Sequence, residues 1–347
     1  MKRGFSFIQY CVKGKECVRI AFLYVGAFVG AGFASGSEIQ LYFGNANLLT
    51  LLLSALLTGG FCTLFLCLGS LRVRVCGALH FALDTLFAVS GVIVAGVMLS
   101  SLTELTGTPY AAVGLALLCA ISLLFGEKGV KTFCSLAVPL IAFSLFLVAI
   151  RAKGSVTGSF QGGQAVKYAA MNVFFEFGLM LREGKNISLK WCLLTGICVV
   201  VITFLLLLPM RSVIGDVQQT LPFVSRSASL GFGWLSVITM FAAVGSTVAG
   251  CFSLGTEPLR KLFPQSVCTL MVATVALSIA AGDFTRLIGK VYPVFSAFGI
   301  VLSCISFSVF FAVILGKKRN CKCKFSFLSI FNGRKAGLEG KKQKNGY

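Results

Sequence analysis

Apolar runs of about 20 residues recur along the whole chain, and they constrain its fold more than any other feature. A hydrocarbon core roughly 30 Å thick requires about 20 consecutive apolar residues in helical form. Only 12% of the 347 residues are charged, against roughly 25% in a soluble protein. Continuous runs favour helices, because a membrane β-barrel has weaker, alternating segments of about ten residues. The sequence therefore predicts an all-α membrane protein.

The apolar runs divide into ten predicted transmembrane spans between a short N-terminal segment, 1–18, and a basic tail, 316–347. The predicted spans are 19–43, 48–70, 79–103, 110–126, 132–151, 165–181, 188–210, 227–254, 265–281 and 287–315. Most of the 31 lysines and arginines fall in segments that share one side of the membrane if both termini are cytoplasmic. The positive-inside rule predicts this bias, so we expect both termini in the cytoplasm. The net charge of +20 then reflects membrane topology and needs no nucleic-acid partner.

Ten spans also form two sets of five, and an odd number of spans reverses the orientation of the second set. Such inverted repeats are common in secondary transporters. We therefore predict one transporter-like domain, 19–315, with repeat one at 19–151 and repeat two at 165–315.

The first span contains the strongest local signal for a broken helix. Four glycines interrupt it: Gly26, Gly30, Gly32 and Gly36. Glycine costs about 1 kcal/mol relative to alanine inside a helix. Ser35 and Glu38 have the spacing of a capping box, which marks a helix start. We expect one half-helix to end near Val29 and another to begin near Ser35, where free backbone groups can bind ions. The alternative is close helix packing through small residues.

The sixth span carries Asn172 and Glu176, which lie on one helix face because they are four residues apart. An acid inside a span is costly and generally faces a cavity or a partner. Glu176 is therefore a candidate to bind a solute amine, a proton or a cation. The alternative is a location near the cytoplasmic end, paired with Arg182. The short span 165–181 is also consistent with a second discontinuous helix, although its glycine, Gly178, comes late.

The eighth span contains the neighbouring hydroxyls of Ser246 and Thr247, which can offer oxygen ligands to a small cation. Hydroxyls in membrane helices more often bond to a carbonyl of the preceding turn. Most of the 14 cysteines lie in apolar runs, where they act as small hydrophobes. No nucleophile–base set, HExxH motif or phosphate loop is present in the sequence, so we expect no enzyme activity and no catalytic residues.

The first span, from Ala21 through Glu38 to Ile39, closely resembles the opening of the YkvI-like family of bacterial membrane proteins. That family is related to the amino acid–polyamine–cation transporter superfamily, which has the LeuT-type fold of five plus five helices. The resemblance is looser at Tyr168 with Asn172 in the sixth span and at the hydroxyl pair in the eighth. It implies a multi-pass protein of the bacterial cell membrane with a discontinuous first helix.

The resemblance also implies the positions of two binding sites. Sodium would be held by the backbone carbonyls of Gly26, Val29 and Ala243 and by the hydroxyls of Ser246 and Thr247. The solute would lie against Ala31, Gly32, Phe33, Ser35, Gly36, Asn172 and Glu176. Glu38 departs from this pattern by adding a negative charge near the half-helix start.

The expected function is sodium-coupled symport of a small organic solute, such as an amino acid or an amine, by alternating access. A proton is the alternative coupling ion, and no other cofactor or metal is expected. A non-transporting ligand sensor, such as a germinant receptor, is the alternative function on the same fold, and a channel is a weaker one. The expected partners are the solute and the lipid bilayer, and the sequence identifies no protein partner.

Overall fold

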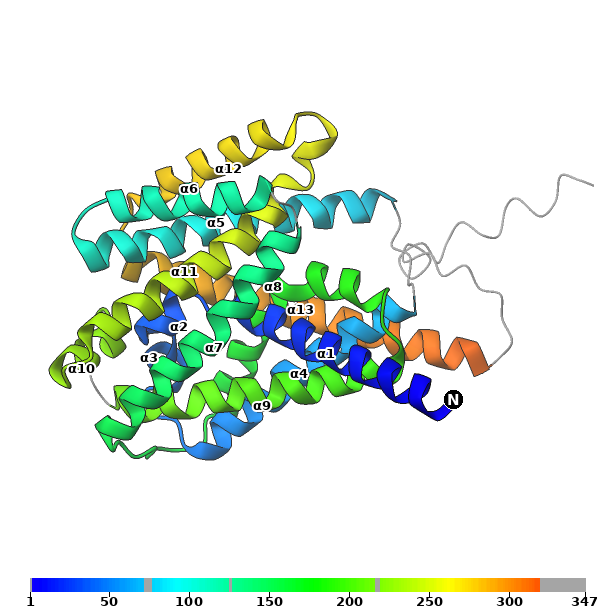
Figure 1. Ribbon diagram of the computed structural model, residues 1–347, viewed down its shortest axis with the longest axis horizontal. Coiled ribbons are helices and arrows are strands. Elements are labelled where there is room, and N and C mark those ends of the chain that lie inside the picture. The colour runs from blue at the N-terminus through cyan, green and yellow to red at the C-terminus, as the bar shows by residue number, and fades with distance from the viewer. Residues whose placement is uncertain (1, 72–76, 125–126, 216–218, 319–347) are drawn as a thin grey trace, which may run out of the picture.

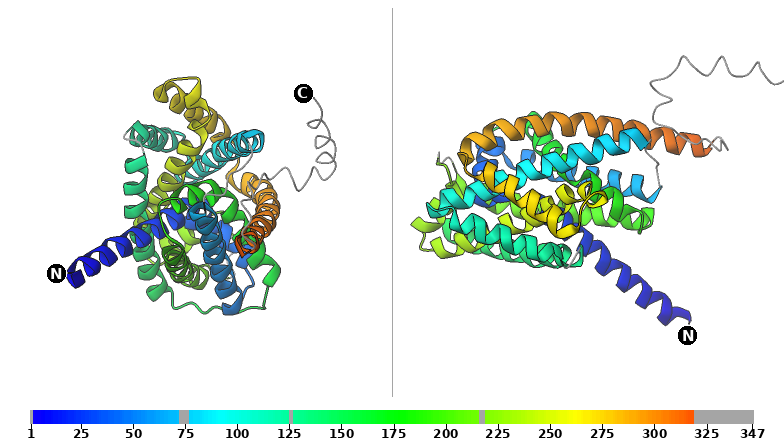
Figure 2. Two further views of the ribbon diagram at one scale, coloured as in Figure 1. Left: turned by 90° about the vertical axis from the view of Figure 1, so that its right-hand side faces the viewer. Right: turned by 90° about the horizontal axis from the view of Figure 1, so that it is seen from above.

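The structure is a computed structural model that describes residues 2–71, 77–124, 127–215 and 219–318. These residues form a bundle of helices without named strands, and one isolated bridge pairs Ala46 with Ser159. The start of the first helix and the end of the last lie at the same end of the bundle (Figure 1). The beginning of the first helix projects beyond its neighbours (Figure 2).

The helices follow the predicted spans closely. In chain order they are α1 (Lys2–Phe28), α2 (Ala31–Ser35), α3 (Ser37–Phe43), α4 (Leu48–Ser70), α5 (Gly77–Thr106), α6 (Tyr110–Leu124), α7 (Glu127–Ala152), α8 (Gly162–Gly184), α9 (Leu189–Ile214), α10 (Pro222–Ser229), α11 (Gly233–Thr256), η1 (Leu259–Lys261), α12 (Gln265–Ala280) and α13 (Phe284–Lys318). The first span is divided among α1, α2 and α3, as predicted. Helices α4 to α9 and α11 to α13 each match one further span, and α10 is an additional short helix.

Length and composition alone identify five of the described helices as able to cross a membrane: α4, α5, α9, α11 and α13. Three further helical segments are apolar but shorter: α6, α12 and the C-terminal part of α7. The interrupted first span and the polar α8 fall outside both groups. These two elements and α11 carry the candidate sites predicted from the sequence.

The contacts between helices have the symmetry of an inverted repeat. The main packing pairs recur when each helix of a pair is replaced by the helix that lies five spans away along the chain. Helix α4 packs on α8 as α9 packs on α1, α5 packs on α12 as α11 packs on α6, and α7 packs on α1 as α13 packs on α8. This pairing is that of the predicted five-plus-five arrangement. The residue limits predicted for the two repeats stay a prediction.

Three boundaries differ from the sequence-based expectation. Helix α1 begins at Lys2, so the N-terminal segment is part of a helix that continues into the bundle. Arg211, expected in an external loop, lies in the last turn of α9 and is 1% exposed. Its guanidinium donates to the carbonyls of Gly215 and Thr157 at 2.9 and 3.1 Å, which satisfies part of its charge inside the protein. Helix α13 extends to Lys318, and the rest of the basic tail lies outside the described residues.

Helix α8 is also continuous, so the predicted break in the sixth span is not present. The physical reason is visible in its composition. Between Gly163 and Gly178 it contains neither glycine nor proline, and nothing there interrupts the helical hydrogen bonds. Close packing holds it in place: a Cβ added at Gly299 of α13 would lie 1.8 Å from the Ala170 carbonyl oxygen of α8.

Candidate functional site

The first transmembrane helix breaks at Val29 and Gly30, as predicted. Helix α1 ends at Phe28, and the Gly30 N–H donates to the Phe28 carbonyl at 2.8 Å. In a continuous helix this N–H would donate to Gly26. The Gly26 carbonyl therefore loses its helical donor. The first helical bond of α2 runs from Ala34 N to Gly30 O at 2.9 Å, so the Val29 carbonyl also precedes the new helix.

A second interruption at Gly36 separates α2 from α3. Gly36 has a φ of 85°, which favours glycine, and it occupies the N-cap position of α3. Glu38 is then the second residue of α3, whereas a capping box requires it at the third. The predicted capping box is therefore wrong. The Ser35 hydroxyl accepts from the Ser37 N–H at 3.2 Å, and Glu38, in the first turn of α3, is 1% exposed.

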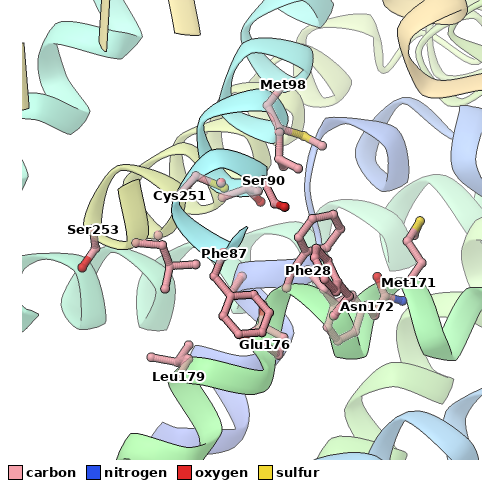
Figure 3. Close-up of a pocket in the computed structure, with 18 of the residues that line it drawn as sticks. Phe28, Phe87, Ser90, Met98, Met171, Asn172, Glu176, Leu179, Cys251 and Ser253 are labelled. Atoms are coloured by element: carbon pink, nitrogen blue, oxygen red, sulfur yellow. The ribbon is translucent and has the colours of Figure 1, made fainter. Parts of the chain in front are cut away.

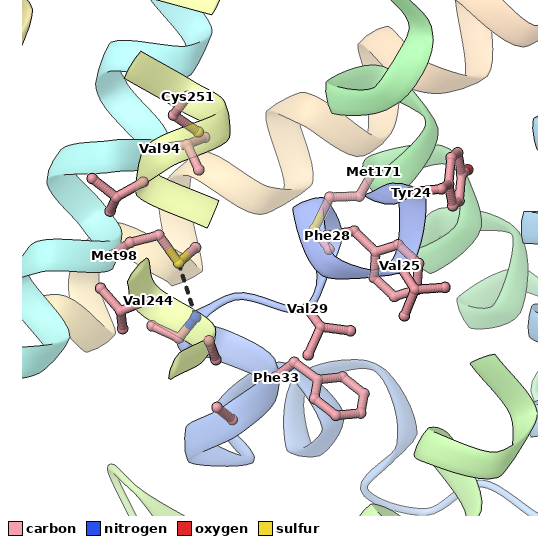
Figure 4. Packing of buried hydrophobic residues seen from close by; sticks show 14 of the residues in the cluster. Tyr24, Val25, Phe28, Val29, Phe33, Val94, Met98, Met171, Val244 and Cys251 are labelled. Atoms are coloured by element: carbon pink, nitrogen blue, oxygen red, sulfur yellow. Dashed lines mark hydrogen bonds between the residues drawn. The ribbon is translucent and has the colours of Figure 1, made fainter. Parts of the chain in front are cut away.

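Met98 of α5 packs against the first break. The sequence did not indicate this contact. The Ala31 N–H at the start of α2 donates to the Met98 sulfur at 3.0 Å (Figure 4). A Cβ added at Gly30 would lie 2.7 Å from this sulfur and 3.1 Å from Oγ1 of Thr247. Gly30 is therefore the point where the first span, α5 and α11 meet. A methionine in an apolar run carries no sequence signal for such a role.

The residues of the predicted ion site are all buried, and α11 packs on both α1 and α2. The Ser246 hydroxyl donates to the Ala243 carbonyl at 2.9 Å, which is the local bonding pattern named above as the alternative. The Thr247 hydroxyl differs, because it is buried next to Gly30 without a hydrogen-bond partner among the described residues. The structure thus brings Thr247 to the break.

A cavity lies beside the break, between α1, α3, α5, α8, α11 and α13 (Figure 3). Four of the residues singled out by the sequence line it: Glu38, Asn172, Glu176 and Thr247. The rest of the lining is mainly apolar or aromatic and includes Leu23, Ala27, Phe28, Phe87, Ser90, Val94, Met98, Met171, Phe174, Phe175, Leu179, Cys251, Leu254 and Tyr292. Apolar walls with a few polar groups are typical of small-molecule sites.

The predicted solute segment from Ala31 to Gly36 is not part of this lining, and its role in solute binding stays a prediction. Every residue of α2 is buried, because this short helix packs against α5, α10 and α11. The cavity is instead lined by α1 residues before the break and by Glu38 after it. Asn172 and Glu176 share a helix face, as predicted, and Figure 3 shows both side chains at the cavity.

The polar atoms of the cavity are poorly satisfied by the described residues. Glu38 and Glu176 are each 1% exposed, and Oε1 of the first and Oε2 of the second have no hydrogen-bond partner there. The same holds for Nδ2 of Asn172. Arg182 forms an ion pair with Glu257 at 4.0 Å, which does not support the alternative that it pairs with Glu176. Buried carboxylates without compensating charge are expensive, so these two groups are suited to hold a cationic ligand or a proton.

Tyr292 of α13 completes the site and was missed by the sequence analysis. A Cβ added at Gly32 would lie 2.6 Å from the Tyr292 hydroxyl and 2.9 Å from Oε2 of Glu38. Gly32 therefore makes room for both groups beside the break. The sequence feature that could have identified Tyr292 is its position as a single tyrosine, next to Pro293, in a mainly apolar span.

No family model and no curated protein matches the sequence. Solved structures do match. One is Mhp1, a nucleobase-cation-symport-1 family transporter, in a closed conformation with bromovinylhydantoin bound. The TM-score is 0.56 with 13% identity, over 86% of this chain and 78% of Mhp1. Another is a mutant of the manganese transporter of Eremococcus coleocola, with a TM-score of 0.53 and 12% identity, over 86% of this chain and 79% of that one.

These similarities, together with the apolar helices, define the class of protein. The chain is a multi-pass membrane protein with the LeuT-type fold, which both of these transporters share. At this level of identity the likeness establishes the fold, and the activity has to be argued from the site itself.

Proposed function

We propose that the protein is a secondary transporter that takes up a small organic solute across the bacterial cell membrane, coupled to sodium. One observation carries the proposal: a cavity lined by unpartnered buried polar groups lies beside a broken helix in a LeuT-type bundle. Helix breaks at mid-membrane typically form substrate and ion sites in secondary transporters. The resemblance of the first span to the YkvI-like family supports the same function.

Sodium coupling is favoured by the oxygen atoms around the break. The Gly26 carbonyl has lost its helical donor, and the Thr247 hydroxyl has no partner among the described residues. The Ser246 hydroxyl donates to the Ala243 carbonyl, and a hydroxyl oxygen that donates can also act as a cation ligand. Carbonyl and hydroxyl oxygens are suitable ligands for a hard cation. A proton carried by a buried carboxylate is the alternative coupling ion.

The packing at the two ends of the bundle is consistent with alternating access. Toward the end that holds α10, the Ser37 hydroxyl donates to the Thr220 carbonyl, and a Cβ at Gly36 would lie 2.6 Å from Ile214 and 3.0 Å from the backbone of Phe223. Toward the other end, the cavity lining extends to Arg182, whose side chain is 35% exposed. With cytoplasmic termini, this arrangement is an inward-facing state.

The decisive experiment is uptake into sealed liposomes. The purified protein is reconstituted, and labelled solutes are offered with an inward sodium gradient or with an equal potassium gradient. We expect at least one solute to accumulate only with the sodium gradient. Binding of a solute without accumulation would refute transport and support the ligand sensor.

The ion site has its own test. We expect sodium to raise the melting temperature of the wild type, and Ser246→Ala with Thr247→Ala to abolish this rise. Ser236→Ala with Thr239→Ala is the matched control, because these hydroxyls lie two turns earlier on α11 and donate to Gly233 and Leu235. If both double variants respond to sodium like the wild type, the assigned ion site is wrong.

A further inference from the structure

Two buried carboxylates face one cavity, and the positive charge around them is small. Glu38 on α3 and Glu176 on α8 are each 1% exposed and each has an unpartnered oxygen among the described residues. Arg182 is the lining residue with a positive charge, and it forms an ion pair with Glu257 at the edge. When ionised, two carboxylates in an apolar cavity are stabilised by positive charge on a bound ligand.

The two carboxylates are held at different levels along α8, so we assign them to different ligands. Glu38 interacts with Tyr168 of α8. Glu176 is eight residues further along the same helix, which corresponds to about 12 Å of axial rise. The described residues also contain no group of three metal-binding side chains. The cavity therefore has two separate negative positions: Glu38 beside the break, near the proposed sodium ligands, and Glu176 nearer to Arg182, among aromatic side chains.

The surroundings of Glu176 are suited to an organic cation. Phe28, Phe87, Phe174 and Phe175 line the same cavity. The ring centroids of Phe87 and Phe174 lie 5.4 Å apart, and the face of an aromatic ring carries negative potential. An ammonium group within about 6 Å of a ring centroid is stabilised by its quadrupole. The apolar remainder of the wall can hold a hydrocarbon chain.

The break itself is poorly suited to a solute carboxylate. The Ala31 N–H, the first donor of the new half-helix, already donates to the Met98 sulfur at 3.0 Å. Glu38 lies beside Gly32, with Oε2 2.9 Å from the position of an added Cβ. A second carboxylate there would meet the like charge of Glu38, which is an effective way to exclude a ligand.

We infer that the transported solute is an organic amine without a carboxylate, held by its ammonium group at Glu176, while Glu38 offsets the charge of the coupling cation. This inference rests on the proposed transport function and gives it a substrate class. One sodium ion and one ammonium group together match the two negative charges of the cavity.

The test uses pairs of solutes that differ only by the carboxylate: phenethylamine with phenylalanine, isoamylamine with leucine, and cadaverine with lysine. Each is offered to proteoliposomes under an inward sodium gradient, beside a broad mixture of labelled solutes. We expect at least one amine to accumulate and its amino acid partner to be excluded. Accumulation of an amino acid as fast as its amine would overturn the inference and leave transport intact. So would uptake of other solutes without any amine. Absence of uptake altogether would overturn the proposed function as well.

Variants of Glu176 test its role directly. Glu176→Gln keeps the shape and removes the charge, so we expect KM for the amine to rise roughly 30-fold or more. The rise in melting temperature with sodium should persist, because Glu38 is unchanged. Glu16→Gln is the control, since Glu16 pairs with Arg19 at 2.8 Å on the exposed part of α1. An unchanged KM for the amine in Glu176→Gln would refute the inference.

A conservative variant keeps the test informative if Glu176→Gln does not fold. Glu176→Asp retains the charge on a shorter side chain, so amines should stay preferred over amino acids with a weaker KM. Loss of that preference in a protein that elutes as a single gel-filtration peak would contradict the assignment.

Discussion

Gly32→Ala tests the arrangement of the site with one added methyl group. The new Cβ would lie 2.6 Å from the Tyr292 hydroxyl and 2.9 Å from Oε2 of Glu38, whereas ordinary contact begins at 3.4 Å. Tyr292 and Glu38 must therefore both move. Overpacking of this kind typically costs 1–3 kcal/mol. If that cost falls on the solute-bound state, KM for uptake rises roughly 5- to 160-fold, since about 1.36 kcal/mol corresponds to a factor of ten.

The assay is initial-rate uptake in proteoliposomes, with expression and gel-filtration profile compared in parallel. Gly178→Ala is the control, because a Cβ at Gly178 in α8 meets nothing within 4 Å. Adding Tyr292→Phe to Gly32→Ala removes the nearer clash and should recover part of the lost affinity. The contact with Glu38 remains, so recovery stays incomplete. If Gly32→Ala transports like Gly178→Ala, the assigned packing of Glu38 and Tyr292 at the break is wrong.

Three further predictions concern the fold. Met98→Leu removes the acceptor of the buried Ala31 N–H, so we expect a loss of about 1–3 kcal/mol in stability, read as a lower melting temperature in detergent. Gly299→Ala should lower the melting temperature strongly, because its Cβ would lie 1.8 Å from the Ala170 carbonyl oxygen, whereas Gly289→Ala on the same helix should not. Tags at the two termini should resist protease in intact cells and be cleaved after permeabilisation.

Each of these has a clear contrary outcome. A melting temperature unaffected by Met98→Leu would mean that the thioether does not hold the start of α2. Equal stability of Gly299→Ala and Gly289→Ala would contradict the close contact of α8 with α13. Cleavage of either tag in intact cells would refute the predicted topology.

The fold could be predicted from the sequence because its main signals are local. An apolar run of about 20 residues sets the length of a span, and each predicted span is matched by a helix or, in the first, by three. Gly30 and Gly36 lie at the two interruptions of the first span. Gly36 has a φ of 85°, which few other residues adopt, and a Cβ at Gly30 would lie 2.7 Å from the Met98 sulfur. Arg211 was misplaced because its partners, the carbonyls of Gly215 and Thr157, lie outside the helix that carries it.

The site was predictable only in part, because its contacts join distant segments. Asn172 and Glu176 stood out as polar residues inside a span, and both line the cavity. Glu38 was read as a helix cap, since its spacing from Ser35 is a local pattern, while its actual neighbours come from α8 and α13. Met98 has no distinguishing feature in its own span. The sodium ligands and the solute class stay predictions.

Because α8 is a continuous helix, its part of the site can be altered by single side-chain substitutions. An unbroken helix bonds its own peptide groups, so it has no free backbone dipoles to offer at its centre. Recognition along α8 must then come from side chains, here Asn172 and Glu176. Side chains can be exchanged one at a time, whereas carbonyls at a break depend on backbone geometry. Selectivity for the solute could therefore diverge through changes in α8 while the ion-binding geometry of the first span stays the same.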